Sequence, residues 1–185
     1  MNRRAALSIL TAVPAFAQAQ PDPRLVIILI GPPGSGKSTQ AAYLQKRRKL
    51  PLVTLDDIKD APDAKAIPES RKRVKAIDWS KGFILDGYPR SRAQADDLGV
   101  FVRELKLPAP IVIQLDVPDD VARQRVQADK NYPKANFESE LARYHRELEF
   151  ARSYYPEADI WTVIGNKTPL EVRETIEMLI RDRLQ

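Results

Sequence analysis

The sequence predicts an α/β fold, in which a parallel β-sheet of about five strands is flanked by α-helices. Short apolar runs recur along the chain, at residues 25–30, 52–53, 83–85, 111–115 and 160–164. The run Leu25–Ile30 is apolar at every position, as expected of a central parallel strand covered on both faces. Polar stretches of helical length separate the runs, and such alternation favours a parallel sheet that binds ligands beyond the carboxyl ends of its strands.

The helices are expected in the stretches that follow the strands. We predict them at residues 37–48, 91–106, 118–129, 137–154 and 169–183. The stretch from Lys59 to Ser80 contains Pro62, Pro68 and many charges, so it is expected to be irregular or only briefly helical.

Length and composition restrict the function classes. A chain of 185 residues with 43% hydrophobic content fits one compact domain, assigned here to residues 20–185. The formal charge of +5 suits small anionic substrates as well as nucleic acid. The absence of cysteine excludes disulfides, zinc–thiolate clusters and thiol catalysis, and it leaves the redox compartment open.

Residues 1–19 have the layout of a signal peptide. Arg3 and Arg4 precede a short apolar run, and small residues at alternate positions end in Ala17 and Ala19. We expect an exported, periplasmic protein if this signal is used. The alternative is a cytoplasmic protein with a non-functional extension. No later segment is long enough to span a membrane.

A phosphate-binding motif follows the first strand. Residues 31–38, Gly-Pro-Pro-Gly-Ser-Gly-Lys-Ser, match G-x-x-x-x-G-K-[ST], the P-loop, between a predicted strand and a predicted helix. Backbone N–H groups and the helix N-terminus then face the phosphates, Lys37 reaches the β- and γ-phosphates, and Ser38 supplies a hydroxyl to Mg²⁺. The fold is therefore expected to be of the P-loop NTPase type. The nucleotide-binding residues predicted from the motif are Gly31, Gly34, Ser35, Gly36, Lys37, Ser38 and Thr39.

A second motif indicates the kind of P-loop protein. Residues 82–90, Gly-Phe-Ile-Leu-Asp-Gly-Tyr-Pro-Arg, are followed by Gln94, and this segment resembles the adenylate kinase and nucleoside monophosphate kinase family. Asp86, at a strand end, can hold Mg²⁺ through its water shell, and Arg90 can clamp an acceptor phosphate. The resemblance implies that Gly87 and Gln94 read the acceptor base.

Two later segments resemble the same family. Residues 163–172 resemble its closing strand, turn and last helix, which implies backbone contacts from Gly165 and Lys167 to the ATP base, although a plain strand–turn–helix closure fits as well. Residues 117–125 resemble its ATP-facing helix, with Arg125 a better candidate than Arg123; a solvated helix face is the alternative.

The resemblance implies phosphoryl transfer from ATP, with Mg²⁺ as cofactor, to a nucleoside monophosphate, foremost AMP. Lys37, Arg90 and Arg125 are the catalytic candidates, and a monomer without a stable nucleic-acid partner is expected. The acceptor-binding candidates are Thr54, Asp56, Lys59, Gly87, Arg90 and Gln94.

The chain departs from the family pattern in two shortened segments. Between Lys59 and Gly82 there is little room for the usual acceptor-binding arm, and Lys59 replaces an arginine. The lid region, Asp129 to Glu140, is also short and lacks the run of arginines that the resemblance implies. Glu140 stands where the family has a catalytic arginine, and Lys130 and Lys134 are candidates to compensate in part. Both changes leave the catalytic rate and the identity of the acceptor open.

Two other functions remain open from the sequence. Asp56 follows the second strand, where kinases of polynucleotides or small metabolites place an aspartate as general base for a hydroxyl acceptor. A nucleotide-binding protein with weak or no catalysis is the other possibility, because the lid lacks its arginines.

Overall fold

The computed structural model describes residues 23–185, so the predicted signal peptide lies outside the described residues. Within them, a five-stranded parallel sheet has the strand order β2-β3-β1-β4-β5. The strands are β1 (Leu25–Ile30), β2 (Leu52–Thr54), β3 (Gly82–Asp86), β4 (Ile111–Asp116) and β5 (Ile160–Ile164). The predicted α/β class and all five strands are confirmed.

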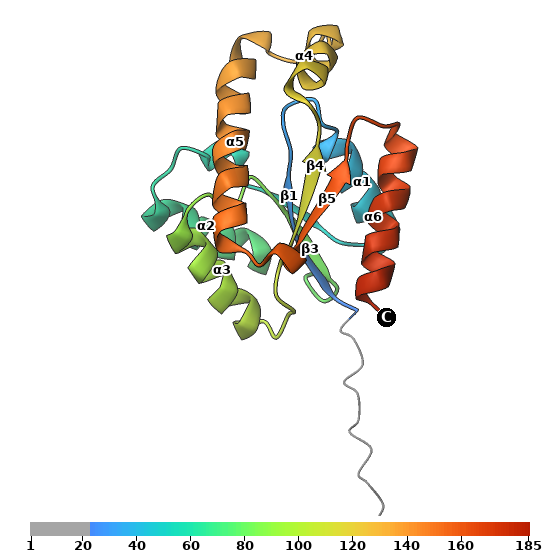
Figure 1. Cartoon of the computed structure of the whole chain (residues 1–185). Helices are drawn as coiled ribbons and strands as arrows, with labels where there is room; N and C mark the ends of the chain where they lie inside the picture. The colour runs from blue at the N-terminus through green and yellow to red at the C-terminus, as the bar shows by residue number, and fades with distance from the viewer. Residues whose placement is uncertain (1–22) are drawn as a thin grey trace, which may run out of the picture.

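In the described part of the chain, six α-helices surround the sheet (Figure 1). They are α1 (Lys37–Arg48), α2 (Asp63–Lys75), α3 (Arg92–Glu104), α4 (Asp119–Ala128), α5 (Phe137–Tyr154) and α6 (Pro169–Arg183). Three short 3₁₀ turns complete the described chain, at residues 56–58, 134–136 and 157–159. The predicted helices α1, α5 and α6 are confirmed to the residue, and the ends of α3 and α4 lie within two residues of those predicted. Among residues 23–185, no helix combines the length and the apolar character that a membrane span needs.

The central strand β1 is apolar throughout because helices cover both of its faces. Val26, Ile28 and Ile30 belong to one buried cluster, which α2, α3 and α5 close. Leu25, Ile27 and Leu29 belong to the opposite cluster, which α1 and α6 close. Burying apolar surface stabilises a fold by about 25 cal/mol per Å². Because β1 is buried on both faces, it lies at the centre of the core.

The prediction for residues 59–80 was wrong in one respect, because this segment contains the 13-residue helix α2. Pro62 precedes the helix as its N-cap, whereas Pro68 lies inside it. The small or apolar residues Ala66, Ser70 and Val74, spaced by four, are buried against the sheet side. Tertiary packing of this face therefore outweighs the unfavourable helix propensity of Pro68.

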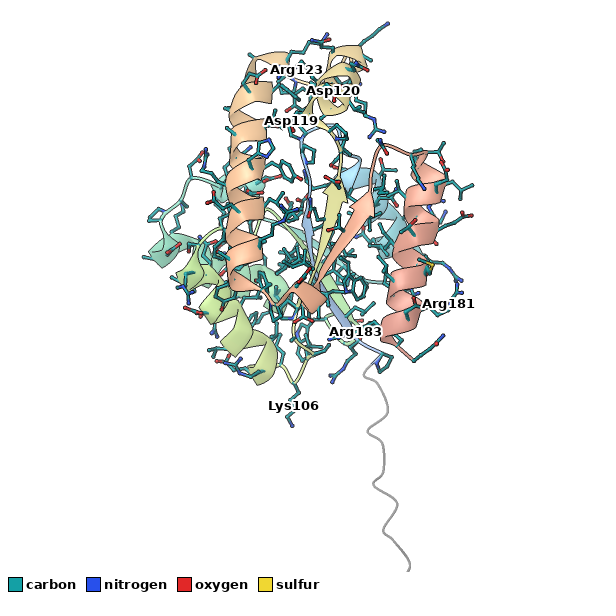
Figure 2. The ribbon with its side chains drawn as sticks, viewed as in Figure 1. Lys106, Asp119, Asp120, Arg123, Arg181 and Arg183 are labelled. Atoms are coloured by element: carbon teal, nitrogen blue, oxygen red, sulfur yellow. The ribbon has the colours of Figure 1, made fainter. Side chains whose placement is uncertain are left out.

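All five strands point the same way, toward the end of the molecule where α4 lies (Figure 1). Figure 2 shows Asp119, Asp120 and Arg123 at this end, and Lys106, Arg181 and Arg183 at the opposite one. The loops after the strands therefore gather at the α4 end. Ligands of open parallel sheets bind at this edge, where the strand order reverses on either side of β1.

Candidate active site

The P-loop connects β1 to α1 and forms an open cradle. Gly34 and Gly36 have φ angles of 75° and 91°, which glycine adopts without strain. A Cβ atom at Gly36 would meet no atom of the described residues within 4 Å, so the backbone faces open space there. Lys37 Nζ donates to the Gly31 carbonyl at 2.7 Å, and the buried Ser35 Oγ has no hydrogen-bond partner among residues 23–185. These features suit a loop that receives a phosphate chain.

A cavity of about 240 Å³ lies on one side of the P-loop, between α1, α4 and the turn after β5. Arg125 Nη1 donates to the Gly165 carbonyl at 2.9 Å, so α4 is tied to that turn. Arg123 instead pairs with Glu138 of α5, outside this cavity. The structure thus places Arg125, and not Arg123, at the predicted nucleotide site. The predicted residues that line this cavity are Gly34, Ser35, Gly36, Thr39, Arg125, Gly165 and Lys167.

A groove of about 400 Å³ runs along the P-loop and shares Gly34 and Arg125 with this cavity. Ser38 and Asp86 both line the groove, as the prediction of a Mg²⁺ site requires. No cluster of three or more metal-ligating side chains exists among residues 23–185. One hydroxyl, one nearby carboxylate and open space for phosphate oxygens and water nevertheless fit Mg²⁺, which keeps several waters and binds with substrate phosphates.

Asp86 ends β3 and is almost fully buried, with 9% of its surface exposed. Burial raises the pKa of its carboxyl above the ordinary value; the charge of Lys37 lowers it, and that of Asp56 adds to the increase. A buried carboxylate of this kind gains from a nearby cation, because its charge is costly where water is excluded. Asp86 is therefore placed to interact with a hydrated cation in the groove.

A third cavity, of about 140 Å³, adjoins this groove at Lys37 and Asp86 and is lined by Arg90. Arg90 donates from Nε to Glu147 at 2.9 Å and from Nη2 to Asp56 at 2.7 Å. Gly87 makes room for this pairing, because a Cβ there would lie 2.4 Å from Arg90 Nη2 and 2.6 Å from Asp56 Oδ1. Its φ angle of 75° also favours glycine. Lys59 lines the same cavity.

The remaining acceptor candidates lie less directly in the cleft. Gln94 is buried, and both ends of its amide are bonded within the chain: Oε1 accepts from Arg90 N and Nε2 donates to Asp63, each at 2.8 Å. The space beside it measures only about 10 Å³. Thr54 has an exposed side chain, and its carbonyl accepts from Arg73. The roles of Gln94 and Thr54 in acceptor binding stay predictions.

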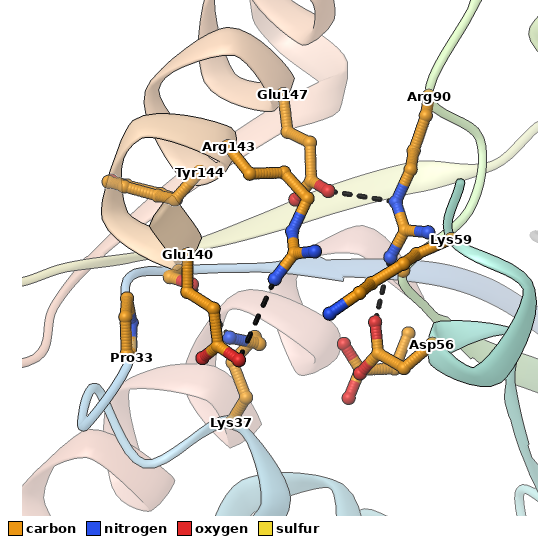
Figure 3. Close-up of a pocket in the computed structure, with 12 residues that line it drawn as sticks. Pro33, Lys37, Asp56, Lys59, Arg90, Glu140, Arg143, Tyr144 and Glu147 are labelled. Atoms are coloured by element: carbon orange, nitrogen blue, oxygen red, sulfur yellow. Dashed lines mark hydrogen bonds and ion pairs between the residues drawn. The ribbon is translucent and has the colours of Figure 1, made fainter. Parts of the chain in front are cut away.

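Helix α5 contributes four cleft residues that the sequence analysis did not assign to the acceptor side: Glu140, Arg143, Tyr144 and Glu147. Figure 3 shows Arg143 extending from α5 toward the space between Glu140 and Lys59. Positions 140, 143, 144 and 147 share one helix face because they are three, four and seven residues apart. The spacing was visible in the sequence, but the direction of this face depends on how α5 packs. Lys130 and Lys134, which lie in the lid region, are exposed.

Comparison with known proteins gives the family. No family model matches the chain. The chain is 37% identical to an adenylate kinase of Methanosarcina barkeri over 122 residues. This match covers 54% of this chain and 57% of that protein. A Leptospira biflexa adenylate kinase is 34% identical over 122 residues, or 54% of this chain and 66% of that protein. These matches span little more than half to two thirds of those relatives.

A longer match covers nearly the whole fold. An adenylate kinase of Brucella anthropi is 32% identical over 191 aligned positions, which cover 83% of this chain and 97% of that protein. The five-stranded parallel sheet flanked by helices is consistent with this match. The chain therefore belongs to the adenylate kinase family.

Proposed function

We propose that this protein transfers the γ-phosphoryl group of ATP to a nucleoside monophosphate, foremost AMP. The observation that carries the proposal is that three adjoining cavities lie in a row at the carboxyl edge of the sheet. The 400 Å³ groove shares Gly34 and Arg125 with the 240 Å³ cavity, and Lys37 and Asp86 with the 140 Å³ cavity. This row of cavities supports binding of a donor base, a phosphate chain and an acceptor phosphate, in that order.

Lys37 and Arg90 act by charge and position. An oxygen of the acceptor phosphate is already an anionic nucleophile, so its attack on the γ-phosphorus needs no general base. The new P–O bond forms as the bond to the β,γ-bridging oxygen breaks, and ADP leaves with that electron pair. Lys37 neutralises charge on the donor side and Arg90 on the acceptor side. Ser38, and Asp86 through water, would hold Mg²⁺, which would supply charge neutralisation at the phosphate oxygens.

The base contacts are part of the same proposal. The backbone of Gly165 and Lys167 and the guanidinium of Arg125 line the donor cavity, where a planar group can stack against an adenine. On the acceptor side Gly87 and Gln94 are the candidates. Gln94 already bonds Asp63 and the Arg90 backbone, so an acceptor base has to exchange with those contacts or use the backbone beside them.

The test is phosphoryl transfer by the purified full chain with ATP·Mg²⁺ and each of AMP, GMP, CMP and UMP, with a 5′-hydroxyl oligonucleotide as a further acceptor. Nucleoside diphosphate formation that Lys37→Ala lowers by roughly 10²-fold or more supports the proposal and identifies the acceptor. Transfer to the oligonucleotide alone would replace it with a hydroxyl kinase. ATP binding without transfer to any acceptor would replace it with a nucleotide-binding protein.

Export through residues 1–19 and a monomeric state also remain proposals. The mass of the chain recovered from expressing cells tests the first, because cleavage after Ala17 or Ala19 removes a defined N-terminal segment. Light scattering tests the second.

A further inference from the structure

Helix α5 presents one cation to the cleft. Its cleft-lining residues are Glu140, Arg143, Tyr144 and Glu147, and of these Arg143 alone is positively charged. The neighbouring Arg146 is on the same helix but is exposed. Arg143 is half-buried, and Figure 3 shows its guanidinium reaching into the cavity and away from the helix axis.

The partner of Arg143 holds it only loosely. Its Nη2 lies 3.8 Å from Glu140 Oε1, longer than a hydrogen bond. Glu140 is itself engaged elsewhere, because its Oε2 accepts from the Tyr132 hydroxyl. Arg90, by contrast, forms two short charged hydrogen bonds. A guanidinium has five donors in a planar fork, so Arg143 keeps most of its capacity for a ligand.

The opposite wall of the cavity carries further positive charge. Lys37, Lys59 and Arg90 line the same 140 Å³ space as Arg143. Four cations around one small cavity repel each other unless anions lie among them. In the structure the anions are four carboxylates of the chain, those of Asp56, Asp86, Glu140 and Glu147. Of the four cations, Lys37 and Arg143 approach from opposite walls, the P-loop and α5, and both line the space that a phosphoryl group between those walls would occupy (Figure 3).

We propose that Arg143 is a catalytic residue that binds the phosphoryl group in transit between donor and acceptor, with Glu140 as its counterion in the free protein. The proposal rests on the phosphotransferase function proposed above. On binding, phosphate oxygens replace the distant Glu140 carboxylate, and the guanidinium forms shorter, charge-assisted hydrogen bonds. Arg143 thereby adds a positive charge on the α5 side of the phosphoryl group, opposite the P-loop and away from Arg90.

The test measures binding and turnover in the full chain and in Arg143→Ala, Arg143→Lys and Arg146→Ala. The probes are ATP·Mg²⁺ and a bisubstrate compound in which five phosphates join two adenosines; calorimetry gives each Kd, and thermal unfolding checks that every variant is folded. We expect Arg143→Ala to weaken the bisubstrate compound about 10- to 100-fold and to lower kcat about 100-fold. ATP affinity should change less than about threefold, since the donor cavity does not include Arg143.

The lysine variant should recover part of the loss, because it keeps the charge but not the planar fork. Arg146→Ala should behave like the unchanged chain. Equal bisubstrate affinity and kcat in Arg143→Ala and the unchanged chain would overturn the inference alone. An unchanged chain that binds ATP but neither binds the bisubstrate compound nor forms a diphosphate would overturn the proposed function together with the inference.

Discussion

The donor and acceptor sides of the cleft hold their cations in different ways. On the donor side, Lys37 and Arg125 donate to backbone carbonyls, those of Gly31 and Gly165. On the acceptor side, Arg90 is paired with the carboxylates of Asp56 and Glu147, and Arg143 faces Glu140. The two donor-side cations therefore have uncharged partners, whereas Arg90 and Arg143 on the acceptor side have charged ones.

This difference predicts how the two substrates bind. A phosphate that displaces a carbonyl gains a charged hydrogen bond, whereas one that displaces a carboxylate exchanges one charged hydrogen bond for another. The donor site is therefore ready for a polyphosphate, and the acceptor site is electrically balanced before its ligand arrives. We expect ATP alone to bind more tightly than AMP alone.

The largest expected effect compares one lysine from each side. Lys37→Ala should lower kcat/KM by roughly 10²- to 10³-fold, because it removes a preorganised charge at the transferring phosphoryl group. Lys59→Ala should lower it by about 10-fold, mainly through a higher KM for AMP. Steady-state kinetics with both substrates varied measures each value. Equal losses in the two variants would contradict the distinction between the sides.

Gly87→Ala should damage the acceptor side alone. The new methyl group would lie 2.4 Å from Arg90 Nη2, and alanine is strained at a φ of 75°. We expect kcat/KM for AMP to fall about 10- to 100-fold and the free energy of unfolding to fall by roughly 1–3 kcal/mol. The Kd of ATP, measured by calorimetry, should be unchanged.

Gly99→Ala is the matched control for this variant. Gly99 lies inside α3, and a Cβ there meets only Arg103 Nη1, at 3.5 Å. The exchange should stabilise the helix by roughly 0.5–1 kcal/mol. A Gly87→Ala variant with ordinary AMP kinetics would show that the Arg90–Asp56 pair does not shape the acceptor site.

Asp56→Asn should have a smaller effect and separates two kinds of kinase. The Asp56 carboxylate is largely exposed and accepts from Arg90, which fits a residue that positions the arginine. We expect kcat to change by less than about fivefold in the assay with AMP, since a general base contributes roughly 10²- to 10⁴-fold. A loss in that larger range would make Asp56 the base of a hydroxyl kinase.

The smallest expected effect concerns the contact between α2 and α3. Arg71 of α2 hydrogen-bonds Asp97 and Glu104 of α3 and lies 4.7 Å from the centre of the Phe101 ring. These bonds raise the pKa of its guanidinium above the usual value. Arg71→Ala should lower the free energy of unfolding by about 1 kcal/mol.

Chemical denaturation measures this loss, with Lys72→Ala as control. The Lys72 side chain is 79% exposed and 3.8 Å from Glu69, so its removal should change little. If both variants were equally stable, the link between α2 and α3 would rest on apolar packing alone.

Much of the fold followed from local patterns. The apolar strand Leu25–Ile30 and the P-loop after it identified the centre of the sheet and the donor site, because both depend on consecutive residues. Helix α6 was also predictable: Thr168 and Glu171 form a capping box around Pro169. Helix α2 was not, because Pro68 argues against a helix and the buried face of Ala66, Ser70 and Val74 is only weakly apolar.

The sequence by itself determined the sheet, the phosphate cradle and the family, because each is encoded in short runs whose spacing fixes their geometry. Only the tertiary structure decided which arginines face the cleft. Arg125 donates to the Gly165 carbonyl, whereas Arg123 pairs with Glu138. Arg143 lines the same cavity as Lys37, whereas Arg146 is exposed. The direction of a charged side chain on a helix depends on how that helix packs against distant segments, and no local pattern records it.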